Sequence, residues 1–116
     1  MRITIEVGKE VTYWFEVKDR WSRGDLRLWR EALAKDELAL RNDAKADESH
    51  TLTLLGQWCP ALYVEDLDGK AYHTVAELSA EVLDALDAPA TRVLYNLPTI
   101  AFNQRAALGE LKSGLS

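Results

Sequence analysis

The first seventeen residues constrain the fold more than any other part of the chain, because they hold two short runs of apolar–polar alternation. The apolar positions are Ile3, Ile5 and Val7, then Val11, Tyr13, Phe15 and Val17. A period of two residues is typical of a strand with one buried face. Gly8 and Lys9 lie between the runs and indicate a turn. Residues 1–17 are therefore predicted to form a β-hairpin.

The length of the hairpin loop decides which faces the two apolar runs occupy. A two-residue loop would pair Val7 with Glu10 and place the two runs on opposite faces. A three-residue loop, residues 8–10, pairs Val7 with Val11 and gathers all the apolar side chains on one face. We therefore predict the three-residue loop.

This register also fixes the outer face of the hairpin. Arg2 falls opposite Glu16, and Trp14 lies beside Thr4, away from the apolar face. An isolated two-stranded sheet is marginally stable in water. The hairpin must therefore pack on helices from the rest of the chain or on another copy of itself.

The composition indicates one globular domain, residues 1–116. The chain is 47% hydrophobic and 28% charged, which excludes a disordered protein. No apolar run approaches the ~20 residues that cross a bilayer, and the N-terminus does not resemble a signal peptide. The single cysteine, Cys59, cannot form an intrachain disulfide. A cytoplasmic protein that does not bind membranes is the expectation.

Charge is distributed unevenly along the chain. Residues 1–45 carry ten basic and nine acidic side chains, whereas residues 46–116 carry four basic and ten acidic ones. Nucleic-acid binding requires clustered Lys and Arg that neutralise phosphates. The sequence therefore favours protein partners over nucleic acid.

The middle of the chain is predicted to be helical. Ser22 and Asp25 form a capping-box pair, and apolar residues recur at helical spacing from Leu26 to about Leu40. Residues 42–49 are polar and predict a loop. Residues 51–58 fit a short helix or a strand, and we favour helix.

Two alternatives remain for residues 62–73. The first is a second, very short hairpin with Gly69 at its turn. The other is a helix that continues to Val64 and is followed by a loop. Thr74 and Glu77 then form a capping box, which predicts a helix with Val75, Leu78, Val82 and Leu86 facing inward.

The C-terminal part of the chain is predicted to hold two more helices. Apolar residues recur at threes and fours between residues 91 and 111, at Val93, Leu94, Leu97, Ile100, Ala101, Leu108 and Leu111. Asn96 as cap and Pro98 in a first turn favour a second helix starting there. The predicted fold is thus α+β: residues 1–17 as a hairpin, packed on a bundle of three to five short helices within residues 22–112.

No set of residues indicates catalysis or a cofactor. His50, Cys59 and His73 lack the close spacing of metal ligands, so Cys59 is interpreted as a free, partly buried thiol and His73 as an exposed loop residue. Residues 66–69 fail the calcium-loop pattern at its first and last positions and predict a turn. Glu77, Glu81 and Asp84 predict a solvated acidic helix face. We expect neither enzymatic activity nor a metal.

Arginine and tryptophan near the first helix suggest a protein-binding surface. Arg23, Arg27 and Arg30 recur on one side of that helix, and both residue types are enriched in interface hot spots. Trp29 is predicted to belong to the core. Trp14 on the outer hairpin face and Trp21 before the helix are harder to bury in one small domain. The candidate partner-binding residues are Trp14, Trp21, Arg23, Arg27 and Arg30.

Three features in order resemble the tail assembly chaperones of long-tailed bacteriophages. They are the opening hairpin of residues 2–15, the apolar segment from Leu52 to Trp58, and residues 63–69 followed by residues 74–78 and an acidic amphipathic helix. The helix after Pro98 extends past the part that matches. That family carries no catalytic residues.

The resemblance implies a non-enzymatic assembly factor in the host cytoplasm. Such a protein coats the tape-measure protein and recruits tail-tube subunits to it, and a homo-oligomer is compatible with that role. The alternatives are a structural virion protein, such as a head–tail connector or tail-associated protein, and a small bacterial protein-binding module.

Overall fold

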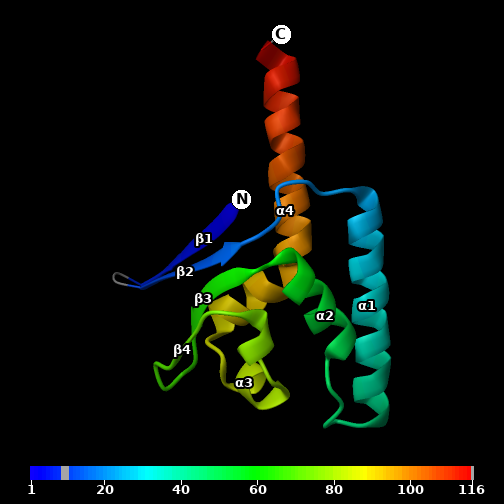
Figure 1. Ribbon diagram of the computed structural model, residues 1–116, viewed down its shortest axis with the longest axis vertical. Helices are drawn as coiled ribbons and strands as arrows, with labels where there is room; N and C mark the ends of the chain where they lie inside the picture. Colours follow the sequence, from blue (N-terminus) through cyan, green and yellow to red (C-terminus); the bar gives the residue numbers. More distant parts are fainter. Residues whose placement is uncertain (9–10, 116) are drawn as a thin grey trace.

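The computed structural model describes residues 1–8 and 11–115, with side chains as far as Ala107 of the final helix. An antiparallel four-stranded sheet combines with helices (Figure 1), and the predicted α+β class is confirmed. The elements are β1 (Arg2–Val7), β2 (Val11–Glu16), α1 (Arg23–Asn42), α2 (Ser49–Trp58), β3 (Ala61–Glu65), β4 (Ala71–Tyr72), the 3₁₀ turn η1 (Val75–Glu77), α3 (Ala80–Ala85) and α4 (Ala88–Leu115).

The opening hairpin has the predicted register. Val7 pairs with Val11 and Arg2 with Glu16, and Arg2 Nε donates a hydrogen bond of 2.9 Å to the Glu16 carboxylate. Gly8 has a φ of +72°, the left-handed conformation that glycine adopts without strain. Lys9 and Glu10, the other two residues of the predicted loop, lie outside the described residues.

The second hairpin also forms, and it joins the first. β3 and β4 are connected by a turn in which Gly69 has a φ of +85°, and Asp66 Oδ1 accepts hydrogen bonds from the backbone N–H groups of Asp68 and Lys70, both at 2.9 Å. β3 pairs in turn with the second half of β2, which gives the order β1-β2-β3-β4. The predicted Asp-Gly turn is confirmed, and of the two alternatives for residues 62–73 the short hairpin is the one that forms. The sequence did not predict one continuous sheet.

The core lies between one face of this sheet and the helices. Its members from the sheet include Phe15, Leu62 and Val64, and those from the helices include Trp29, Leu55, Leu94, Leu97 and Ala101, each no more than 2% exposed. The alternation of β2 therefore buries its apolar side as expected. Burying side chains of this size contributes roughly 1.5–3 kcal/mol each to the stability of the fold.

Helices α1 and α2 confirm the predictions for the middle of the chain. Ser22 caps α1, and the Asp25 side chain accepts a hydrogen bond of 2.9 Å from the Ser22 N–H while Ser22 Oγ accepts one from the Asp25 N–H. Residues 51–58 are helical, and α2 begins two residues earlier, at Ser49. A strand, the alternative for this segment, is excluded.

The Thr74 capping box is present, but it opens only one turn of 3₁₀ helix. Glu77 Oε1 accepts hydrogen bonds from the N–H and hydroxyl groups of Thr74. Leu78 then turns into the core at 3% exposure, and Ser79 caps a separate short helix, α3. The prediction of one continuous helix is wrong, because the backbone leaves helical geometry at Leu78 and Ser79. Glu77 consequently shares no helical face with Glu81 and Asp84. Val75, Leu78 and Leu86 are nevertheless buried, as predicted.

The prediction of a new helix at Pro98 is also wrong. Pro98 lies inside α4, which runs unbroken from Ala88 to Leu115, and Asn96 donates its side-chain amide to the Arg92 carbonyl instead of capping. A proline inside a helix costs about 3 kcal/mol. Pro98 is fully buried between Leu94 and Ala101 on the core side, so packing offsets that cost. The side chains of Leu108 and Leu111 lie outside the described part.

The molecule is elongated, with principal extents of 52 × 36 × 19 Å. Figure 1 shows the reason: the second half of α4 projects beyond the sheet and the other helices. In the described part of the chain, no helix has both the length and the apolar character that crossing a bilayer requires.

A buried carboxylate joins α1 to α2. Asp36, 3% exposed in the middle of α1, accepts hydrogen bonds from the backbone N–H groups of His50 and Thr51 at 3.2 and 2.8 Å. The Thr51 hydroxyl donates another of 2.6 Å, and His50 Nδ1 lies 2.8 Å away. Asp36 thus caps the N-terminus of α2, which has no local side-chain cap.

We expect Asp36→Ala to lower the free energy of unfolding by ~3 kcal/mol, because it leaves several buried donors without an acceptor. Urea unfolding followed by circular dichroism measures this loss. Glu37→Ala is the matched control. Glu37 is exposed, and its one ion pair among the described residues is with Arg41, so its removal should change stability by less than ~1 kcal/mol. Equal losses for the two variants would contradict the role given to Asp36.

The same site predicts an acid-sensitive contribution to stability. Burial acts to raise the pKa of Asp36, but the hydrogen bonds from Thr51 and His50 outweigh it and hold the pKa below its usual value. The folded state therefore binds this proton less tightly than the unfolded state, whose pKa is about 3.9. The stabilisation is complete above that pKa and is lost as the pH falls through the folded pKa. Unfolding curves of wild type and Asp36→Asn should converge in that acid range.

Candidate protein-binding surface

The structure brings the three predicted arginines together along one side of α1. Arg23, Arg27 and Arg30 are exposed at spacings of four and three residues, which place them on one face of a helix. All three line a groove of about 440 Å³ between α1 and α4. The predicted cluster is therefore a concave surface.

The floor of this groove is apolar. Leu26 of α1 and Phe102 of α4 line it and are half-buried, and Glu31 is the acidic residue at its border. An aromatic ring and a leucine beside guanidinium groups offer a site for a partner segment that has an apolar side chain flanked by carboxylates. We name the surface formed by Arg23, Leu26, Arg27, Arg30, Glu31 and Phe102 the arginine groove.

The arginines of the groove are not neutralised within the described part of the chain. Two other cations on or near α1 are neutralised, since Arg41 pairs with Glu37 at 2.8 Å and Lys18 pairs with Asp25 at 2.7 Å. Among the described residues, no carboxylate forms an ion pair with Arg23, Arg27 or Arg30. In a chain with net charge −5, this is a local positive surface that attracts acidic groups.

Trp21 lies outside the groove and packs within the chain. Its ring meets Trp58 edge to face at 5.3 Å, and its Nε1–H donates a hydrogen bond of 2.8 Å to the Lys18 carbonyl. The Lys18 ammonium lies 4.7 Å from the Trp21 ring centre. Trp21 is half-buried, so part of its surface remains accessible beside these contacts.

Trp14 occupies the predicted outer face of the sheet, opposite Thr4 and Tyr63. The Arg2 guanidinium covers its ring at 4.2 Å, and the side chain is half-buried. The five predicted residues thus fall at three places. The arginines form one surface, Trp14 lies on β2, and Trp21 lies in the linker before α1.

Sequence reasoning missed Phe102. The pattern of α4 placed Ala101 in the core, where it is fully buried, and gave its neighbour no role. Only the packing of α4 against α1 brings Phe102 to the arginines. The signal available in the sequence was an aromatic residue next to a core position on a helix.

The three residues considered for chemistry lie apart. His50 lies in the first turn of the ten-residue helix α2 and Cys59 directly follows its end, a separation of about 14 Å of helix rise. His73 is exposed, with its ring 5.7 Å from that of Tyr63. Within the described residues, no group of three or more His, Cys, Asp and Glu side chains is placed to hold a metal ion.

His50 is the residue whose setting most resembles that of a catalytic base. Asp36 orients its Nδ1, and the ring borders a groove of about 310 Å³ between α1 and α2. The nearby Thr53 hydroxyl, however, donates to the Ser49 carbonyl at 2.6 Å. A base that activates a side-chain nucleophile lies within hydrogen-bond reach of it, and among the described residues His50 makes no hydrogen bond with a hydroxyl group.

Comparison of the chain with models of protein families, with curated proteins and with solved structures found no match. The groove and its charges therefore carry the functional argument.

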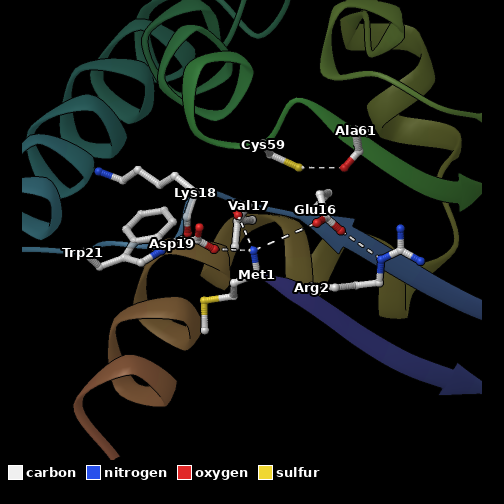
Figure 2. A network of polar contacts seen from close by, with 9 residues as sticks. All are labelled: Met1, Arg2, Glu16, Val17, Lys18, Asp19, Trp21, Cys59 and Ala61. Carbon is white, nitrogen blue, oxygen red and sulfur yellow. Dashed lines mark hydrogen bonds and ion pairs between the residues drawn. The ribbon is translucent and has the colours of Figure 1, made fainter. Parts of the chain in front are cut away.

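Cys59 should be unreactive in the folded protein. It is 1% exposed, and its Sγ–H donates to the Ala61 carbonyl at 3.3 Å (Figure 2). Burial raises the pKa of the thiol to about 11, so little thiolate exists near neutral pH. We expect slow modification by a disulfide reagent at pH 8 and rapid, stoichiometric modification in denaturant. Equal rates under the two conditions would contradict the buried position.

Proposed function

We propose that this protein is a non-enzymatic assembly factor that binds an acidic, helical segment of a partner protein in the arginine groove. The observation that carries the proposal is the set of three arginines without ion-pair partners among the described residues, next to an apolar floor of Leu26 and Phe102. Arginine is enriched among the residues that dominate protein-binding energy, and phenylalanine is enriched at the centres of interfaces.

The spacing of the arginines suits a helix better than an extended strand. Arg23 and Arg30 are seven residues apart, a rise of about 10.5 Å along α1. Carboxylates on a partner helix at positions i, i+4 and i+7 repeat with the same rise. Such a helix would lie along α1 and place apolar side chains on Leu26 and Phe102.

The most specific form of the proposal is a tail assembly chaperone of a long-tailed bacteriophage. The resemblance of the hairpin, the Trp58 segment and residues 63–78 supports it, and a long helical tape-measure protein is a partner of the kind the groove suits. In this role the chain acts in the host cytoplasm without a cofactor, and recruits tail-tube subunits. Several copies on one long partner would bind by many weak contacts.

Co-expression with the tape-measure protein encoded near this chain tests that form directly. We expect the two proteins to co-purify and the partner to become more soluble. The assembled particles should lack this chain by mass spectrometry, whereas a fixed copy number in the particles would support a structural virion protein instead. Failure to co-purify would rule out the tape-measure partner.

Charge reversal in the groove tests the surface itself. Arg27→Glu should weaken binding of the partner at least about tenfold, because it removes a central cation and adds a repulsive carboxylate. Arg92→Glu is the matched control, since Arg92 is exposed on α4 and does not line the groove. Titration calorimetry or a fluorescence titration measures the dissociation constant of the partner for both variants. Equal effects of the two changes would show that only net charge matters.

A further inference from the structure

The strand β1 has a free edge. It is the first strand in the order β1-β2-β3-β4, so only one of its two sides is paired in the described structure. With six residues, β1 is longer than β4, the two-residue strand at the other edge of the sheet. Unpaired backbone groups on such an edge accept another strand readily.

The hydrogen bonds at Met1 show which backbone groups face outward. Met1 and Val17 exchange both bonds: Val17 N–H donates to Met1 O at 2.8 Å, and the Met1 ammonium donates to Val17 O at 2.9 Å, the bond drawn in Figure 2. Bonded pairs alternate along an antiparallel ladder. The odd-numbered residues of β1 therefore bond to β2. The N–H and C=O groups of Arg2, Thr4 and Glu6 point to the free edge.

The sequence of β1 is complementary to itself about Thr4. In an antiparallel pair of two copies centred there, Thr4 faces Thr4 of the second copy, Arg2 faces Glu6, and Ile3 faces Ile5. The outward backbone groups allow only registers that pair even residues with even residues. Among these, the register centred on Thr4 alone sets each Arg2 opposite a Glu6.

We propose that two copies of this chain associate through their β1 strands, in the register centred on Thr4, to form one continuous eight-stranded sheet. Three backbone pairs, those at Thr4 and at the two Arg2–Glu6 positions, supply the hydrogen bonds. Glu6 forms no ion pair among the described residues, so it is available for a second copy. Arg2 already binds Glu16, and its five donors allow a second carboxylate.

The charges on β1 favour pairing rather than prevent it. Sheet edges are often protected by lysine, proline or inward-pointing charges, which repel or block a second strand. In β1 the two charged residues, Arg2 and Glu6, have opposite signs and lie two residues on either side of Thr4, on the exposed face. Two copies consequently attract one another in this register.

The apolar face of the hairpin gives a further reason for a second copy. Ile3 is 4% exposed, whereas Ile5, Val7 and Val11 towards the tip are only half-buried. A second sheet joined at β1 would place Ile3 and Met1 of one copy beside Ile5 and Val7 of the other. This extends the apolar surface continuously across the pair and removes part of it from water.

Disulfide trapping tests the register. Residues facing each other in a bonded pair have Cα atoms about 5.5 Å apart, within disulfide range. Thr4→Cys should therefore cross-link to itself on mild oxidation. Arg2→Cys should not, because two copies of residue 2 lie about 14 Å apart. A mixture of Arg2→Cys and Glu6→Cys should cross-link. Wild type is the control, since Cys59 is buried.

Light scattering on the purified wild-type chain tests the association itself. We expect the measured molecular mass to be twice that of one chain over a dilution series. Thr4→Pro should give the mass of a single chain, because it removes an outward N–H that β2 does not use. Thr4→Val keeps that N–H and should stay paired. A wild-type chain of single mass, a Thr4→Pro variant that still pairs, or equal cross-linking of Thr4→Cys and Arg2→Cys would overturn the proposal.

Discussion

The pairing of β2 with β3 is the interaction on which the rest of the structure depends. Neither hairpin has enough strands to be stable in water by itself. Trp14, Phe15 and Glu16 pair with Tyr63, Leu62 and Ala61 and turn two ribbons into one sheet. That sheet has a continuous apolar face, and α2 and α4 pack their buried side chains against it. Without this pairing, Phe15 and Leu62 would not share a core.

Local rules predicted much of this fold. The alternation of residues 3–17 was sufficient to choose the register of the hairpin, because a shift by one residue would have exposed an entire apolar face. Ser22 and Asp25 located the start of α1 correctly, and Gly69 located the second turn. Each of these features depends on residues that are close in sequence, where side-chain chemistry acts directly on the backbone.

The errors arose where tertiary packing overrides a local signal. Pro98 is a helix breaker in isolation, but α4 continues through it because Leu94, Leu97 and Ala101 are buried together. The capping box at Thr74 forms as expected, yet the helix that it opens ends after one 3₁₀ turn, and Ser79 caps a separate helix, α3. The arginine groove shows the same limit. The helical spacing of the arginines on α1 was sufficient to predict that they share one face. Phe102 belongs to a helix far along the chain, and no local pattern marks it.

The contact between two tryptophan rings at the end of α2 has a spectroscopic consequence. Trp21 and Trp58 lie edge to face at 5.3 Å, close enough for their electronic transitions to couple, and Lys18 lies over both rings. The linker that holds Trp21 connects the sheet to α1, and Trp58 ends the helix that leads into β3. The coupled circular-dichroism signal of this pair thus reports on the junction of sheet and helices, because among the described residues neither Trp29 nor Trp14 is paired with a second tryptophan ring.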